Sequence, residues 1–160
     1  MIGDKEKDII YIGSDHAGYK EKESLREYLK TQGYQLIDLG CFNEDSCDYP
    51  DIADEVGEKV SETQGARGIL FCGTGIGMSI AANKLKGVRA ALCNDEAAAE
   101  MARRHNDANV ITMGARVTGM EEQKKIATKF LTTEFEGSKK GGERHLRRVK
   151  KMTELENKRK

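Results

Sequence analysis

The feature that most constrains the fold is a regular alternation of short apolar runs with longer stretches of helix-forming composition. Five runs are rich in β-branched and aliphatic residues and predict strands: 9–12, 35–39, 68–71, 88–92 and 109–113. The stretches between them predict helices over 20–32, 52–63, 77–84 and 96–104. Because parallel strands need helical crossovers, this order predicts a doubly wound α/β fold, a five-stranded parallel sheet with helices on both faces.

The chain continues beyond the last predicted strand. A fifth helix is expected over 119–132, then a flexible connector over 136–142 and a charged C-terminal helix over 143–160. The last helix carries a narrow apolar stripe at three-residue steps, which we expect to pack on a partner subunit: Leu146, Val149, Met152 and Leu155. We find no internal repeat, and expect one domain over 1–160 with a polar N-terminal extension at 1–7.

Composition excludes several classes of protein. Apolar residues make up 38% and charged residues 34%, with one proline, which excludes collagen-like and low-complexity chains. Neither a signal peptide nor a run long enough for a membrane span is present, so we expect a cytoplasmic protein without a membrane partner. Cysteines 41, 47, 72 and 93 lack a CxxC spacing, which argues against a zinc site, and we expect all four to stay thiols.

The charges are distributed unevenly although their formal sum is zero. Residues 138–160 contain ten Lys or Arg and three Asp or Glu, which leaves the rest of the chain at minus seven. A solvated helix face explains this as well as an anion-binding role does. Nucleic acid is not an expected partner, because the basic segment has neither interleaved aromatic residues nor a known reader motif.

One glycine-rich segment is the most informative about chemistry. Residues 71–84 read Phe-Cys-Gly-Thr-Gly-Ile-Gly-Met-Ser-Ile-Ala-Ala-Asn-Lys, a strand that runs through three alternating glycines into a helix. Such glycines let backbone amides approach an anion, and the same field would keep Cys72 partly as thiolate. The pattern matches neither G-x-G-x-x-G nor the P-loop, and Cys72 can equally be a small buried residue.

The three histidines each lie in a further polar segment. Gly-Ser-Asp-His-Ala-Gly at 13–18 follows the first strand, and Asp15 there is either a functional carboxylate or a helix N-cap. Arg-Arg-His-Asn-Asp-Ala-Asn at 103–109 is either a site or an ordinary polar turn. Arg-His-Leu-Arg-Arg at 144–148 offers guanidinium groups suited to phosphate, or a solvated face.

Together these segments resemble the ribose-5-phosphate isomerase B family, which also contains galactose-6-phosphate isomerase subunits and allose-6-phosphate isomerases. The similarity covers about residues 8–152, and its motifs occur in the family's order: 13–18, Asp-Tyr-Pro at 48–50, 72–84, His-Asn-Asp at 105–107 and Gly-Ala-Arg at 114–116. The resemblance implies a Rossmann-like fold, no metal or cofactor, and a homodimer or dimer of dimers with active sites shared between subunits.

The resemblance also implies roles for individual residues in the chemistry. Cys72 would be the base that moves a proton between C2 and C1 of the sugar. Thr74 would hold the enediolate together with the glycine-rich loop, and Asp15 would bind substrate hydroxyls. His105 would help to open the furanose ring.

Further residues would bind the substrate. Loop residues Gly73, Gly75, Gly77 and Ser79 would contact it, Asn106 would lie beside His105, and Tyr49 would line the sugar pocket. The phosphate would be held by His16, Arg116, Arg144 and Arg148, several of them reaching a neighbouring subunit's site. Many relatives lack a counterpart of Ser-Lys-Lys at 138–140, which bears on the register of Arg144.

Three other functions compete with ribose 5-phosphate isomerisation. A hexose 6-phosphate such as allose or galactose 6-phosphate would need a roomier pocket. A non-catalytic sugar-phosphate-binding module is a second alternative, since a fold does not dictate function. A nucleic-acid adaptor that uses the basic tail would bind in a salt-sensitive way.

Overall fold

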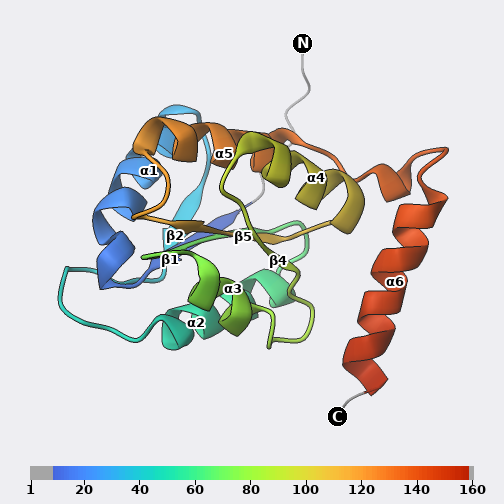
Figure 1. The fold of residues 1–160 in the computed structure, drawn as a ribbon, viewed down its shortest axis with the longest axis horizontal. Helices are drawn as coiled ribbons and strands as arrows, with labels where there is room; N and C mark the ends of the chain where they lie inside the picture. Colours follow the sequence, from blue (N-terminus) through green and yellow to red (C-terminus); the bar gives the residue numbers. More distant parts are fainter. Residues whose placement is uncertain (1–8, 159–160) are drawn as a thin grey trace.

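A computed structural model describes residues 9–158 of the protein (Figure 1). Its strands are β1 (Ile10–Ser14), β2 (Leu36–Asp38), β3 (Arg67–Cys72), β4 (Ala90–Leu92) and β5 (Val110–Gly114). Its α-helices are α1 (Tyr19–Thr31), α2 (Tyr49–Glu62), α3 (Ile76–Ala82), α4 (Glu96–Asn106), α5 (Met120–Thr132) and α6 (Glu143–Lys158). Two 3-10 helices, η1 (His16–Gly18) and η2 (Glu136–Ser138), complete the list.

The five strands form one parallel sheet in the order β2-β1-β3-β5-β4. Figure 1 shows α1, α4 and α5 on one face of this sheet and α2 and α3 on the other. The predicted doubly wound fold with covered faces is therefore confirmed. The central strand is β3, whose carboxyl end carries Cys72.

Each face of the sheet has its own hydrophobic core, because successive side chains of a strand point to opposite faces. On β3, Ile69 and Phe71 join the core under α1, α4 and α5, while Leu70 and Cys72 join the core under α2 and α3. Cys72 therefore lies on the α2 and α3 side of the sheet. It is 5% exposed.

Two helix boundaries differ from the sequence-based prediction in a way that matters for the site. Helix α2 begins at Tyr49 rather than at 52, because Pro50 fits the first turn of a helix, where a backbone N–H has no partner to lose. Helix α4 continues to Asn106 and ends at Asp107, whose φ of 48° is left-handed. The prediction of a helix end at 104 was wrong, and His105 and Asn106 lie on the last helical turn.

Two other expectations need correction. Cys41 and Cys47 form a disulfide in the structure, so the expectation that all four cysteines stay thiols was wrong for this pair, whereas Cys72 and Cys93 are free. The connector at 136–142 is not simply flexible, because it contains η2 and buried glycines. The predicted polar extension at 1–7 and the last two residues of the predicted C-terminal helix lie outside the described residues.

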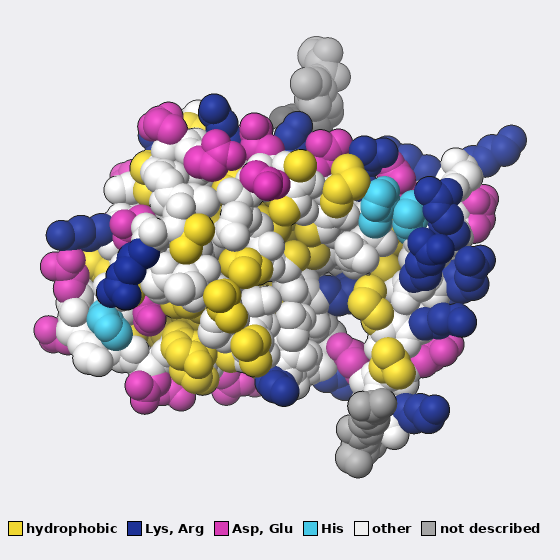
Figure 2. Space-filling view, viewed as in Figure 1, with side chains coloured by type: hydrophobic (Ala, Val, Ile, Leu, Met, Phe, Trp, Pro, Cys, Tyr) yellow, Lys and Arg dark blue, Asp and Glu magenta, His cyan; other side chains and the backbone are white. Residues whose placement is uncertain are grey.

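Helix α6 stands at one side of the molecule (Figure 1). It contacts the body near its start, through buried His145 and Val149, and near its end, where the Gly87 N–H lies 3.2 Å from the Glu156 carboxylate oxygens. Between these contacts lies a cavity of about 380 Å³ lined in part by Asn106 and Met152. Figure 2 shows this hollow and the Lys and Arg side chains along α6.

The predicted apolar stripe of α6 divides into two halves. Val149 is buried against its own chain, whereas Met152 and Leu155 are 36% and 53% exposed. Among the described helices, none combines the length and the apolar composition needed to cross a bilayer.

Candidate active site

The first candidate group lies at the carboxyl edge of the sheet, where ligands of doubly wound folds bind. Strands β1 and β3 pair Ser14 with Phe71, so the next residues, Asp15 and Cys72, lie side by side. On its other side Cys72 pairs with Gly114 of β5. Three strands thus bring these segments together as the sequence predicted.

The glycine-rich turn folds back over Cys72. Gly75 adopts φ +78°, and its N–H donates a hydrogen bond to Cys72 Sγ at 3.0 Å. The buried Thr112 hydroxyl fixes the turn by donating to the Gly75 carbonyl at 2.8 Å. The Gly75 N–H therefore holds the Cys72 side chain against the start of α3, at the carboxyl edge of the sheet.

Two side chains approach the turn because glycines leave room for them. A Cβ on Gly77 would lie 2.7 Å from the Tyr49 ring, so this ring packs directly on the loop backbone. A Cβ on Gly73 would lie 3.2 Å from Arg116 Nη1, which places the guanidinium over the same turn. Tyr49 and Arg116 therefore join the group around Cys72.

Asp15 acts as an N-cap, as one of the two sequence-based interpretations proposed. Its Oδ1 accepts the N–H groups of Ala17 at 3.0 Å and Gly18 at 3.2 Å, and the side chain is buried. Both bonds use the same carboxylate oxygen, so capping does not occupy Oδ2. The neighbouring His16 has its Nδ1 3.3 Å from the backbone of Cys47, which directs the ring toward the loop that precedes α2.

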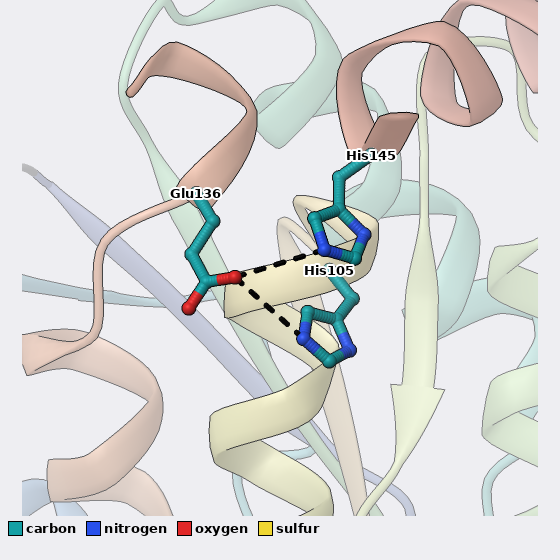
Figure 3. A group of neighbouring side chains, drawn as sticks. All are labelled: His105, Glu136 and His145. Carbon is teal, nitrogen blue, oxygen red and sulfur yellow. Dashed lines mark ion pairs between the residues drawn. The ribbon is translucent and has the colours of Figure 1, made fainter. Parts of the chain in front are cut away.

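A second group forms where α4, η2 and α6 meet (Figure 3). The rings of His105 and His145 stack at 4.2 Å between centroids with 5° between their planes. The Nε2 atoms of both rings lie 3.7 Å from Glu136 Oε2. Glu136 Oε1 meanwhile accepts a hydrogen bond from Arg104 Nε at 2.5 Å.

The protonation of this second group follows from its surroundings. The hydrogen bond from Arg104 lowers the pKa of Glu136 below its ordinary value, so the group is a carboxylate. Burial lowers the pKa of His145, and the charges of His105 and Arg144 act in the same direction. Burial and these neighbouring charges thus favour the neutral form of His145.

The two groups lie at opposite edges of the sheet. Cys72 ends β3 at the carboxyl edge, whereas His105 lies on the last turn of α4, which returns the chain to the amino edge where β5 begins. The five residues of β5 alone span roughly 16 Å. The fold of one chain thus gathers Asp15, His16, Tyr49, residues 72–79 and Arg116, but keeps His105, Asn106, Arg144 and Arg148 with α4 and α6.

Comparison with known proteins shows which family has this arrangement. The family model described as Ribose/Galactose Isomerase matches residues 10–152. The chain belongs to this family. Ribose-5-phosphate isomerase B of Escherichia coli is 39% identical over 150 residues, covering 94% of this chain and 97% of that protein.

Solved isomerases of the same family have the same fold. Ribose-5-phosphate isomerase B of Clostridium thermocellum superposes with a TM-score of 0.87 at 45% identity, covering 95% of this chain and 99% of that one. The Mycoplasma genitalium enzyme, solved with bound ribulose-5-phosphate, gives a TM-score of 0.86 at 42% identity, covering 93% of this chain and 96% of that one. The resemblance inferred from the motifs is confirmed.

Sequence reasoning did not single out Glu136 or His145 as site residues. His145 was seen only as part of a basic segment, and Glu136 as the start of a connector. Their meeting with His105 depends on how α6 turns back against α4, which no local pattern specifies.

Proposed function

We propose that this protein is an aldose-ketose isomerase that interconverts D-ribose 5-phosphate and D-ribulose 5-phosphate in the pentose phosphate pathway. The observation that carries the proposal is the Gly75 N–H bonded to Cys72 Sγ, beside Asp15, at the carboxyl edge of the sheet. Membership of the isomerase family supports it.

The reaction needs a base next to the substrate's C2. The Cys72 thiolate takes the C2 proton of the open-chain aldose, and the electron pair moves to the C1 carbonyl oxygen. The Cys72 thiol returns that proton to C1 of the resulting enediolate, and the proton of O2 passes to O1, so that O2 becomes the ketose carbonyl oxygen and O1 becomes a hydroxyl. Thr74 and the amides of the glycine-rich turn, including those of Gly75 and Gly77, stabilise the negative charge of the enediolate.

The other residues bind and prepare the sugar. Asp15 Oδ2 accepts a substrate hydroxyl, while Tyr49 and Ser79 line the pocket that holds the chain of carbons. His105, with Asn106 beside it, opens the furanose ring. Phosphate contacts far from C1 and C2 position these carbons against Cys72; His16 and Arg116 supply them from the Cys72 group, and Arg144 and Arg148 from α6.

We infer that two copies of the chain, forming a homodimer or a dimer of dimers, complete each site. The support is the separation within one chain of Cys72 from His105 and the arginines of α6. The exposed apolar residues Met152 and Leu155 give α6 a surface to pack on the other subunit. The whole chain then acts as one isomerase domain that needs its copy.

A substrate panel tests the activity. Purified protein without added metal is assayed with ribose 5-phosphate, allose 6-phosphate and galactose 6-phosphate, and ketose formation is measured. We expect the highest kcat/KM for ribose 5-phosphate. A higher value for a hexose 6-phosphate would assign the other substrate of the family, and absence of turnover with all three would refute isomerisation.

Mixing two inactive variants tests the shared site. In Cys72→Ala mixed with His105→Gln, random pairing makes half of the dimers mixed, and each mixed dimer has one complete site. We therefore expect about a quarter of wild-type activity after subunit exchange. If each site were built within one chain, mixing would restore none.

A further inference from the structure

The second group, formed by His105, Glu136 and His145, contains a buried nitrogen without a hydrogen-bond partner. Within residues 9–158, His145 Nε2 is one of the buried side-chain atoms that form no hydrogen bond. Only 5% of the His145 side chain is exposed. Buried polar atoms of native proteins nearly always have a partner, so one without a partner needs an explanation. The atom faces Glu136 Oε2 at 3.7 Å, beside His105 (Figure 3).

The three side chains have the composition of a metal site. Two imidazole nitrogens and a carboxylate oxygen are ligands that Zn²⁺ accepts in sites with a free fourth position. Their ligand atoms all lie within 4.8 Å of one another. In tetrahedral coordination with bonds of about 2.0–2.1 Å, neighbouring ligand atoms lie about 3.3 Å apart.

The two distances to Glu136 are close to that spacing, and all three ligand atoms lie within 4.8 Å of one another. Each Nε2 lies 3.7 Å from Glu136 Oε2, a few tenths of an ångström too far. The parallel rings must also tilt so that both nitrogen lone pairs meet at one point. His105 can make this turn because 36% of its side chain is exposed, whereas the packing around His145 holds that ring.

The surroundings favour a particular class of ion. Two of the three ligand atoms are imidazole nitrogens, which bind Zn²⁺ and other transition-metal ions. Arg104 holds the other oxygen of Glu136, as groups around a metal ligand commonly do. Mg²⁺ and Ca²⁺ prefer sites made of oxygen ligands, which two imidazole nitrogens do not provide.

We propose that His105, Glu136 and His145 form a binding site for Zn²⁺ or a similar transition-metal ion that bonds strongly to imidazole. Its occupation removes His105 Nε2 from proton transfer. Where the protein acts as proposed above, in which His105 opens the sugar ring, the ion is therefore an inhibitor rather than a cofactor. The inhibitory consequence rests on the proposed function, but binding of the ion does not.

Cobalt binding tests the site directly. Chelator-treated full-length protein is titrated with Co²⁺ alone, and its visible absorption bands report the stoichiometry and the ligands. We expect one ion per chain without a thiolate-to-cobalt charge-transfer band. His145→Gln and Glu136→Gln should each weaken binding at least about tenfold, the scale seen even for groups around metal ligands.

Matched variants control for general effects. His16→Gln removes the third histidine, and Glu143→Gln removes an exposed carboxylate from the same helix as His145. Both should bind Co²⁺ as the wild type does, and circular dichroism verifies that every variant is folded. If His145→Gln does not fold, the Glu136→Gln titration decides.

The outcomes separate the site from the activity. Weakened binding in the two ligand variants and unchanged binding in the controls support the site, whether or not the protein isomerises ribose 5-phosphate. Binding that survives both ligand variants, binding lost in Cys72→Ser, or no stoichiometric binding overturns it. In active protein, Zn²⁺ should inhibit the wild type, and the ratio of rates with and without Zn²⁺ should approach one in Glu136→Gln.

Discussion

Replacing Gly75 by alanine should damage both the fold and the chemistry. At φ +78° a side chain is disfavoured, and the left-handed region costs a non-glycine residue about 1–2 kcal/mol. The added Cβ would also lie 2.6 Å from Leu92 Cδ1, 2.8 Å from the Met113 carbonyl carbon and 3.0 Å from Gly114 N. Two of these three atoms belong to backbone, so they cannot simply move away.

The size of the effect follows from these two terms. Overpacking typically costs a further 1–3 kcal/mol or so, which makes the expected loss in the free energy of unfolding about 2–5 kcal/mol. At about 2–4 °C per kcal/mol for a chain of this size, Tm should fall by roughly 4–20 °C. Displacing the Gly75 amide from Cys72 Sγ should also lower kcat in the fraction that remains folded.

Substitutions at two other glycines separate the cost of the left-handed conformation from the cost of close packing. Gly141 has φ +93° with no atom within 4 Å of an added Cβ, so Gly141→Ala should show the conformational cost alone, about 1–2 kcal/mol. Gly119 has φ −82° and open space but is the N-cap of α5, where glycine is preferred to alanine, so Gly119→Ala should cost about 1 kcal/mol or less, with no strain or clash. Urea unfolding of the three variants measures the difference. A Gly75→Ala protein as stable as Gly141→Ala would refute the argument from close packing.

Three further predictions concern other parts of the molecule. Lys22 is fully buried with its Nζ 2.8 Å from Asp38 Oδ1, so Lys22→Met should lower the free energy of unfolding by about 3–5 kcal/mol. Stability restored by adding Asp38→Asn would show that the loss comes from the Asp38 carboxylate, which then keeps the longer 3.8 Å ion pair with Arg26. An equal loss in the single and the double variant would contradict this. Burial raises the pKa of Cys93 to about 12, so iodoacetamide should label this thiol only after unfolding. Mass spectrometry measures the labelling, and labelling of the folded protein to the same extent as the unfolded protein would disprove this. Because Arg104 lowers the pKa of Glu136, the carboxylate's stabilising contribution is complete above its ordinary value near 4.5 and is lost as pH falls through the lower value in the fold. The Tm difference between wild type and Glu136→Gln should therefore shrink as pH falls below about 4.5, and a constant difference there would contradict the assignment.

Much of the fold was predictable because local patterns and packing agree. The apolar runs around Ile12, Ile69 and Ile111 are β-rich and fully buried, so strand propensity and the burial of both faces favour the same structure. The end of α4 was missed because polar residues 103–107 fit both a turn and a final helical turn. Arg103 stabilises the final helical turn, because its buried side chain donates a hydrogen bond from Nη1 to the Ala108 carbonyl at 2.6 Å.

The candidate site was predictable where it depends on one edge of the sheet. Residues that follow parallel strands must meet there, so the proximity of Asp15 to Cys72 follows from strand order alone. The disulfide between Cys41 and Cys47 was not predictable in this way, because it depends on the path of the long loop between β2 and α2. The same holds for the stacking of His145 on His105, which tertiary packing determines.

The most direct test of the account is the Cys72→Ala variant. Circular dichroism verifies its fold, calorimetry measures ribose 5-phosphate binding, and an assay of ribulose 5-phosphate measures turnover. We expect a folded protein that binds substrate with little change in Kd and has lost isomerisation. Turnover at the wild-type rate would contradict the role of Cys72 as the base that moves the proton.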